Sequence, residues 1–244
     1  MIILHAVKQY RGMEEFRIHF PAGVPVTHLR NYENRYSPCV AYQYAFEYNH
    51  EDVLIYMHDD VSIFDKCWHR RVMEQFVDPV VVCVGLGGAT SLGHPDLYRK
   101  TYQVQKMARM NYWSNQYDWK LHGKQLQSVL QVAVVDAFFM AVRRSFLEEL
   151  GGWPVYTESK GGLTHHCLDL WIGCEAARHN KKVMAVGAAC AHWGGGTSTT
   201  ASYANAPWLQ GGTREEDHAR PHRWLHQNYS DVLPIKIYDL QSAI

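Results

Sequence analysis

Short apolar runs alternate with helical patterns along most of the chain, and this alternation predicts an α/β fold. Strands are expected where a run of strand length is apolar and rich in β-branched residues. These runs are Ile2–Val7, Val53–Met57, Val80–Leu86, Val132–Val135, Phe138–Val142 and Val183–Val186. Because helical segments separate most of them, we expect one mixed, mostly parallel sheet flanked by helices.

The predicted helices have recognisable ends. Ser37 followed by Pro38 favours a helix start, since the hydroxyl can cap the first turn and proline needs no hydrogen bond there. That helix is expected to run to about Tyr48. Three further helices are predicted from a cap at Asp65, a capping box at Ser145–Glu148 with Gly151 as C-cap, and a start at Asp169 with an end near Asn180.

Two stretches lack a clean period. Residues 91–131 follow a strand that Gly87 and Gly88 are expected to close, and residues 197–244 are rich in Gly, Thr, His and Trp. A chain of 244 residues with 47% apolar residues can bury one full core. We therefore expect residues 1–196 to form the main domain and residues 197–244 to be a C-terminal lid or tail packed on it.

Composition limits the environment more than the partner. The 24 basic and 24 acidic residues cancel, and the six cysteines contain no C-x-x-C pair, which indicates a reducing compartment. The longest apolar run, Val80–Leu86, is too short to cross a bilayer, and the first residues lack a basic leader. These features predict a soluble, cytoplasmic protein with no membrane insertion.

The first candidate for chemistry is His58-Asp59-Asp60, directly after a predicted buried strand. Ligands bind at the carboxyl ends of strands in open α/β sheets, and adjacent carboxylates are costly to leave without a cation. Mg²⁺ or Mn²⁺ on such carboxylates, together with phosphate oxygens, is a common arrangement. The same acidic pair is also compatible with a loop start or a helix cap.

Two further residues stand at element ends. His192 follows a strand and precedes three glycines, and an imidazole there can bind a metal or serve a structural role. Asp169 stands at a predicted helix start, where an aspartate can cap the helix or act in catalysis.

The order of these motifs resembles the GT-A glycosyltransferases, in particular the family 2-like branch of bacteria and phages. The resemblance covers residues 1–196 and rests on the acidic motif at 58–60, the segment VDAFFMAVRR at 135–144, the LGGW at 150–153, Asp169 and His192. It implies a metal-dependent enzyme that transfers a sugar from a nucleotide sugar such as UDP-glucose. If phage-encoded, it would work in the host cytoplasm.

The resemblance also implies roles for individual residues. Asp60 and His192 would bind Mn²⁺ or Mg²⁺, with His58 standing where many members have the first acidic ligand and Asp59 sharing that work. Asp136 would lie in the sugar or acceptor pocket. The strand end at His5, Ala6 and Val7 would border the nucleotide base of the donor.

One position departs from the family pattern. Inverting members carry an aspartate as general base two residues before the position of Asp169, and this chain has Cys167 there. Asp169 is the preferred substitute, His165 or His166 is an alternative base, and a retaining reaction would need no such base.

The acceptor is addressed by residues 98–124, which hold six basic residues against the single acid Asp118, interleaved with six aromatic residues. Basic residues contact phosphates, and aromatic rings stack on bases or sugars. We therefore expect an acceptor surface that includes Arg109, Trp113, Trp119 and Lys120. The chain also resembles phage enzymes that glucosylate 5-hydroxymethylcytosine in DNA, which would then be the acceptor. A cell-surface or capsular saccharide is an alternative acceptor, and a protein or small molecule is another. The segment could also be a solvated surface that binds no ligand.

Other classes remain as alternatives to a glycosyltransferase. A nucleotidyltransferase or metal hydrolase also uses paired carboxylates but would usually carry a glycine-rich loop with a lysine after the first strand, and residues 5–10 have no such loop. A non-catalytic nucleotide-sugar-binding module would keep residues 58–60 merely as a loop.

Overall fold

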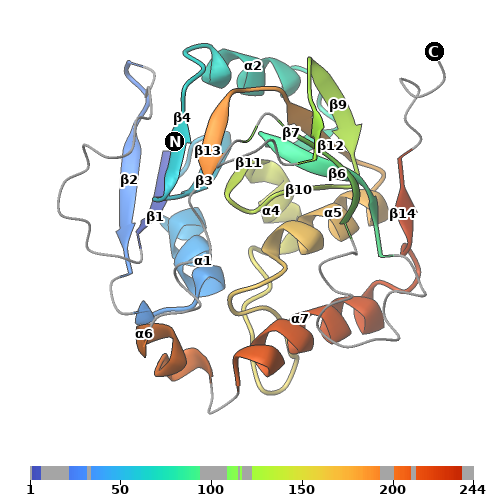
Figure 1. Ribbon diagram of the computed structural model, residues 1–244. Coiled ribbons are helices and arrows are strands. Elements are labelled where there is room, and N and C mark those ends of the chain that lie inside the picture. Colours follow the sequence, from blue (N-terminus) through green and yellow to red (C-terminus); the bar gives the residue numbers. More distant parts are fainter. Residues whose placement is uncertain are drawn as a thin grey trace.

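A computed structural model of the chain describes residues 2–6, 22–31, 34–93, 109–114, 116, 123–192, 201–209 and 213–237. Its centre is a seven-stranded sheet with helices on both faces (Figure 1). In spatial order the strands are β2 (Val26–Arg30), β1 (Ile2–Ala6), β3 (Val53–His58), β11 (Phe139–Arg143), β5 (Val81–Gly85), β12 (Lys182–Val186) and β9 (Val129–Val132).

The sheet is mixed, as the sequence predicts. β2, β1 and β3 are parallel neighbours, and so are β5 and β12. β11 runs antiparallel to both β3 and β5, and β9 runs antiparallel to β12. Since five of the seven strands run the same way, their carboxyl ends share one edge of the sheet.

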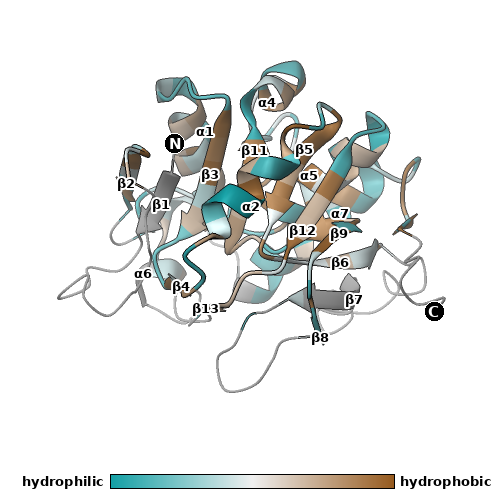
Figure 2. Cartoon of the chain, turned by 90° about the horizontal axis from the view of Figure 1, so that it is seen from above, coloured by the Kyte–Doolittle hydropathy of each residue, from teal (hydrophilic) through white to brown (hydrophobic). Residues whose placement is uncertain are grey.

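The two faces of the sheet are covered by different helices. Along β3, Leu54 and Tyr56 pack in one core cluster with α1 (Pro38–Tyr48), α4 (Arg144–Leu150) and α5 (Leu168–Arg178). The alternate residues Ile55 and Met57 pack in the other cluster, with α2 (Trp68–Gln75). Figure 2 shows apolar residues concentrated on β3, β5 and β12, as expected for strands buried on both faces.

The ends of α1 match the prediction. The Ser37 hydroxyl accepts a hydrogen bond from the Val40 backbone N–H at 3.3 Å, Pro38 is the first helical residue, and the helix ends at Tyr48.

Three other helix starts differ from prediction. α2 has Cys67 at its N-cap, and Asp65 instead accepts from the Cys67 N–H in the preceding turn. α4 begins at Arg144, one residue before the expected capping box, because β11 leads directly into the helix. α5 has Cys167 at its N-cap, so Asp169 lies within the first turn. The C-cap prediction at Gly151 is confirmed by its left-handed backbone (φ 79°).

A second sheet lies beside the first. It runs β10 (Val134–Val135), β6 (Gly87–Leu92), β7 (Arg109–Ser114) and β8 (Lys124–Gln125), with β14 (Ile235–Lys236) on the other end of β6. β5 ends just before Gly87 and Gly88, as expected, but these glycines then begin β6, a strand that the sequence pattern missed. Gly88 pairs with Val135 on one side and Trp113 on the other, and a Cβ there would lie 2.5 Å from the Val134 carbonyl oxygen. The absent side chain allows this close approach.

A two-stranded ribbon and a helical C-terminal segment complete the structure. β4 (Val61–Ile63) pairs antiparallel with β13 (Cys190–His192). The C-terminal segment holds α6 (Ala201–Ala204), the 3₁₀ helix η6 (Pro207–Leu209) and α7 (Arg214–Asn228), which precedes β14 at the side of β6 (Figure 1). The sequence pattern missed α7, which has fifteen residues and contains Pro221. The proposed division at residue 196 stays a prediction.

Candidate metal centre and active site

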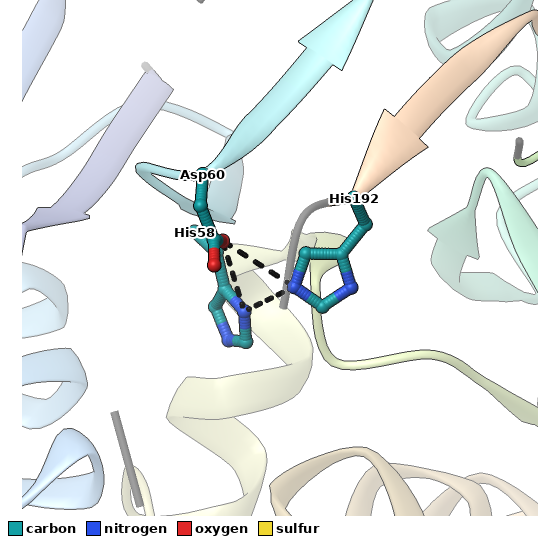
Figure 3. Close-up of side chains that lie close together, drawn as sticks. All are labelled: His58, Asp60 and His192. Carbon is teal, nitrogen blue, oxygen red and sulfur yellow. Dashed lines mark hydrogen bonds and ion pairs between the residues drawn. The ribbon is translucent and has the colours of Figure 1, made fainter. Parts of the chain in front are cut away.

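Three side chains that could hold a metal ion meet where β3 ends, and we call them the metal cluster: His58, Asp60 and His192. His58 is the last residue of β3, Asp60 lies in the two-residue turn that leads into β4, and His192 is the last residue of β13. The ribbon register pairs His192 with Val61, the residue that follows Asp60. Backbone pairing therefore brings His192 beside the acidic turn across more than a hundred residues of sequence (Figure 3).

The three ligand atoms form a compact triangle. His192 Nε2 lies 3.3 Å from Asp60 Oδ1 and 3.3 Å from His58 Nδ1, and His58 Nδ1 lies 4.0 Å from Asp60 Oδ1. A triangle with these sides has one point about 2.1 Å from all three corners, which is the bond length of small divalent ions to nitrogen and oxygen ligands. The spacing of the three ligand atoms is therefore compatible with a divalent cation.

The electrostatics of the cluster suit a cation. Burial lowers the pKa of His58 and the neighbouring His192 lowers it further, although 36% of the His58 side chain is exposed. Burial alone raises the pKa of Asp60, but the hydrogen bond from His192 and the nearby imidazoles outweigh it, so the net pKa is lowered. At neutral pH the cluster thus offers a neutral His58 imidazole and a charged carboxylate, the protonation states that bind metals.

Phe138 contacts both histidines of this cluster, His58 through its backbone and His192 through its ring. Its carbonyl oxygen accepts the His58 backbone N–H at 3.0 Å, and its ring stacks on the His192 ring with centroids 5.1 Å apart. The Phe138 side chain is completely buried among the residues that pack under α2. This packing restricts the rotamer of His192, and the backbone hydrogen bond fixes the end of β3 at His58.

The donor set also narrows the choice of ion. Two imidazole nitrogens and one carboxylate oxygen form the cluster, and among the described residues Asp59 is not part of it. Mg²⁺ prefers oxygen ligands, whereas transition ions accept imidazole readily. Of the two ions expected from the sequence, Mn²⁺ therefore fits this set better, and Fe²⁺ or Zn²⁺ would also suit it.

The residues expected to bind the donor lie on the adjacent strand. His5 in β1 pairs in register with His58, so the end of β1 at Ala6 reaches the same edge of the sheet as the metal cluster. This placement concerns the backbone alone. Val7 lies outside the described residues.

Asp136 occupies the turn between β10 and β11, close to the cluster. Its carboxylate accepts the Phe138 N–H at 3.4 Å, and its backbone N–H donates to Gly87. Its charge acts on His58, where it opposes the lowering of the pKa, and it adds to the burial that raises the pKa of Cys190. The structure therefore brings Asp136 to the predicted site.

The acceptor residues are only partly described. Arg109 and Trp113 stand at the first and fifth positions of β7, and the Trp113 backbone is two strands away from Val135, the neighbour of Asp136. The segment after β7 also returns to the site, because Gln116 forms a bridge with Cys190 of β13. Trp119 and Lys120 lie outside the described residues.

Asp169 is buried under the sheet edge, in the first turn of α5, and is 1% exposed. Its charge and those of Asp59 and Asp60 all add to the burial and the Tyr56 contact that raise the pKa of the Tyr42 phenol. The charges of Asp169 and of the acidic turn thus act on the same buried ring. Cys167, at the helix N-cap, has a left-handed backbone (φ 71°) and is also buried.

His166 belongs to a second polar group that the sequence analysis missed. We call it the Asp217 cluster: Thr164, His166, Tyr203, Asp217 and Arg220, drawn from the loop before α5, from α6 and from α7. The only sequence signal for it is the acidic first turn of α7, which residue patterns alone do not connect to position 166.

The model of a glycosyltransferase-like family matches residues 11–166, which is more than half of the chain. This match defines the chain as a glycosyltransferase. The chain belongs to this glycosyltransferase-like family, which confirms the expected class of enzyme. No curated protein sequence matches the chain.

Several solved structures are distantly similar. A197 from STIV has a TM-score of 0.43 and 14% identity over 78% of this chain and 81% of that one. The mannosyltransferase PcManGT from Pyrobaculum calidifontis, solved with GDP-Man and Mn²⁺, has a TM-score of 0.46 and 13% identity over 78% of this chain and 55% of its own. GalNAc-T7, solved with UDP, GalNAc and Mn²⁺, has a TM-score of 0.42 and 16% identity, and this chain spans 32% of its length. At this distance they carry no argument about substrate or ion.

Among the helices that the structure describes, none is long and apolar enough to cross a membrane.

Proposed function

We propose that this glycosyltransferase uses a divalent cation, bound by Asp60, His192 and His58, to transfer a hexose from a UDP-sugar such as UDP-glucose to an acceptor hydroxyl. The observation that carries the proposal is the shared point about 2.1 Å from the three ligand atoms, a distance that small divalent ions require. Manganese is the preferred ion, with magnesium as the alternative.

The chemistry follows from the position of this cluster. A bound cation supplies positive charge that neutralises the departing diphosphate. Three protein ligands leave coordination positions for the phosphate oxygens of the donor. The end of β1 at His5 and Ala6 lies on the same edge as the cluster and is our proposed border of the nucleotide base.

Asp136 lies in the turn before β11, the strand that pairs with β3 on the side opposite β1. It is our proposed contact for the transferred sugar or the acceptor. It is partly exposed, and its turn joins β11 to the second sheet. A carboxylate at this place can accept hydrogen bonds from sugar hydroxyls and orient the reacting groups. Asp169 and His166 are the remaining candidates for a general base.

The acceptor that we propose is 5-hydroxymethylcytosine in DNA. The basic and aromatic segment 98–124 contains β7, whose partner strand β6 adjoins the turn of Asp136. Phosphates of DNA would contact the lysines and arginines, and an extruded base would stack on an aromatic side chain. A cell-surface or capsular saccharide is the second candidate, because aromatic rings stack on sugars as well.

The metal proposal is tested by thermal unfolding of the purified protein with Mn²⁺ and UDP-glucose. We expect both together to raise the Tm of the wild type, EDTA to abolish the rise, and Asp60→Ala to show none. Asp78→Ala is the matched control, because it removes an exposed carboxylate paired with Lys182. A rise that persists in Asp60→Ala would reject this metal centre.

The acceptor is tested with hydroxymethylated and unmodified DNA duplexes, and with capsular oligosaccharides, each incubated with a panel of UDP-sugars. The DNA is then digested to nucleosides for mass spectrometry. A nucleoside heavier by one hexose, found only with the hydroxymethylated duplex, supports the DNA acceptor. Transfer to an oligosaccharide with no modified nucleoside would replace it with the second candidate.

A further inference from the structure

The carboxylate of Asp217 is completely enclosed and is surrounded by donors from three separate segments. Its Oδ1 accepts a hydrogen bond from the Thr164 hydroxyl at 3.0 Å and lies 3.3 Å from Arg220 Nη2. Its Oδ2 accepts from the Tyr203 hydroxyl and lies 3.5 Å from His166 Nε2. A buried carboxylate with several donors is held in a single position.

Of these contacts, Arg220 and His166 are both partly open to solvent, but only the His166 imidazole has a nitrogen lone pair that can accept a proton. Its side chain is 19% exposed, while that of Asp217 is fully buried. Its Nε2 lies 3.3 Å from the Tyr203 hydroxyl as well as near Asp217, and its ring stacks on His218 with centroids 3.6 Å apart. One ring nitrogen thus faces the enclosed carboxylate, and the ring plane is fixed by packing.

The Asp217 cluster is joined to α1 and to the residues before it by hydrogen bonds. The Thr164 carbonyl accepts the backbone N–H of Cys39 at the start of α1, and α1 carries Tyr42, which feels the charges of Asp169, Asp59 and Asp60. Trp208 of η6 packs on His165 and donates to the Asn34 carbonyl before α1. The C-terminal segment is thereby attached to the loop that leads into α5.

The candidates for a general base differ in access. A base must come within about 3 Å of the hydroxyl that it deprotonates. Asp169 is 1% exposed, so an acceptor can hardly contact its carboxylate. In contrast, 19% of the His166 side chain is exposed. A contact of the Asp–His type also fixes the imidazole tautomer and stabilises its charged form.

We propose that His166 is the general base of the transfer and that Asp217, from the C-terminal helix, is the residue that positions it. This inference rests on the proposed function. In the step, the acceptor oxygen forms a bond to the anomeric carbon while the bond from that carbon to the donor phosphate breaks. The leaving nucleoside diphosphate takes the electron pair, and the acceptor proton moves to His166 Nδ1.

Asp217 and Tyr203 lie next to Nε2 of His166, and this position indicates which ring nitrogen would accept the proton. His166 Nε2 lies 3.3 Å from the Tyr203 hydroxyl and 3.5 Å from Asp217 Oδ2, so the proposal requires a neutral imidazole with its proton on Nε2 and with Nδ1 as the accepting nitrogen. Among the described residues, His165 and His218 pack on this ring, Tyr203 contributes its hydroxyl, and Arg220 pairs with the same Asp217 carboxylate. A single displacement with a base inverts the anomeric configuration, so the product anomer is a further readout.

The kinetic test uses Mn²⁺ and whichever of UDP-glucose, UDP-galactose, UDP-N-acetylglucosamine and GDP-mannose releases nucleotide fastest. We expect Asp217→Asn to lower kcat about 10²- to 10⁴-fold, with the KM for the donor changed less than about threefold. Tyr203→Phe should have a smaller effect in the same direction. Asp231→Asn, which removes an exposed carboxylate paired with Arg178, is the matched control and should leave kcat unchanged.

Chemical rescue separates a base from a structural residue. Free imidazole should restore part of the turnover of His166→Gly but none of that of Asp60→Ala. An unchanged kcat in folded Asp217→Asn, absence of rescue, or a product with retained configuration would each overturn the proposal. Loss of the Mn²⁺-dependent Tm rise in Asp217→Asn would show a role in donor binding and would also overturn it.

A second measurement needs no turnover. Long-range ¹H–¹⁵N NMR of histidine-labelled protein, with the His166 signals identified by their loss in His166→Gln, reports the tautomer of this ring. We expect the Nε2–H form in the wild type and in the Asp231→Asn control, and a changed tautomer ratio in Asp217→Asn. An Nδ1–H tautomer in the wild type would reject the pairing even if the protein proved inactive on every donor, whereas that inactivity alone would count against the proposed function.

Discussion

The metal cluster and the Asp217 cluster are built by different means. His58, Asp60 and His192 each stand at the end of a strand or in the turn after it, and backbone registers bring them together. The Asp217 cluster has no common strand pair, since its members come from a loop and two helices and meet through their side chains.

A site residue at the end of a strand can therefore be predicted from the sequence more readily than one on a packed helix. A strand end has a predictable position, because parallel strands of one sheet end at one edge. A helix-to-loop contact depends on the angle and register of packing, which leave no short-range pattern. The comparison also predicts that the two clusters respond separately to substitution.

Phe138→Ala should have the largest effect and should couple stability to metal binding. Deleting a fully buried phenylalanine costs about 3–5 kcal/mol of unfolding free energy, and here it also removes the ring stacked on His192. We expect lower stability in urea unfolding and weaker Mn²⁺ binding. Phe138→Leu, which keeps most of the volume, is the control, and equal Mn²⁺ affinity in Phe138→Ala and wild type would argue against this coupling.

Thr164→Val should affect only the Asp217 cluster. Valine has the shape of threonine but lacks the hydroxyl that donates to Asp217, so about 1–3 kcal/mol of stability should be lost. Mn²⁺ affinity should be unchanged, as measured by calorimetric titration. A parallel loss of Mn²⁺ affinity would show that the two clusters are not separate.

His58→Asp should change ion preference by the smallest free energy of the three. Replacing imidazole by carboxylate removes a ligand type that transition ions favour, so the preference for Mn²⁺ over Mg²⁺ should fall about tenfold, or about 1.4 kcal/mol. Titrations with each ion measure this ratio. His50→Asp, at an exposed position before β3, should leave the ratio as in the wild type, and a wild-type ratio in His58→Asp would exclude His58 as a ligand.

Much of the fold follows from sequence patterns because strand and cap signals are local. The buried runs around residues 53, 81, 139 and 183 are strands, and α1 begins and ends as predicted. The capping box at Ser145 is wrong because β11 continues without a break into α4, so the tertiary position of the strand overrides a local cap. β5 ends just before Gly87 and Gly88 as expected, but the sequence pattern missed β6, in which close packing against Val134 requires glycine.

The candidate site divides in the same way. The motif at 58–60 and the lone His192 suffice to predict that His58, Asp60 and His192 lie together, because each stands at a strand end and a family resemblance orders them. Their role as metal ligands stays a prediction. His166 could be named only as one alternative base, since its partner Asp217 lies far along the chain in a helix that shows little amphipathic pattern and contains a proline. The roles of Asp136, Asp169 and the donor and acceptor residues stay predictions.

A crystal structure grown with Mn²⁺ and UDP-glucose, with anomalous scattering measured for manganese, tests whether His58, Asp60 and His192 bind the metal ion. We expect one anomalous peak within about 2.3 Å of Asp60 Oδ1, His192 Nε2 and His58 Nδ1. The donor phosphate oxygens should lie on the side of the ion that faces away from these three side chains. Manganese bound elsewhere in the molecule, or a donor held with these three side chains free of any ion, would contradict this expectation.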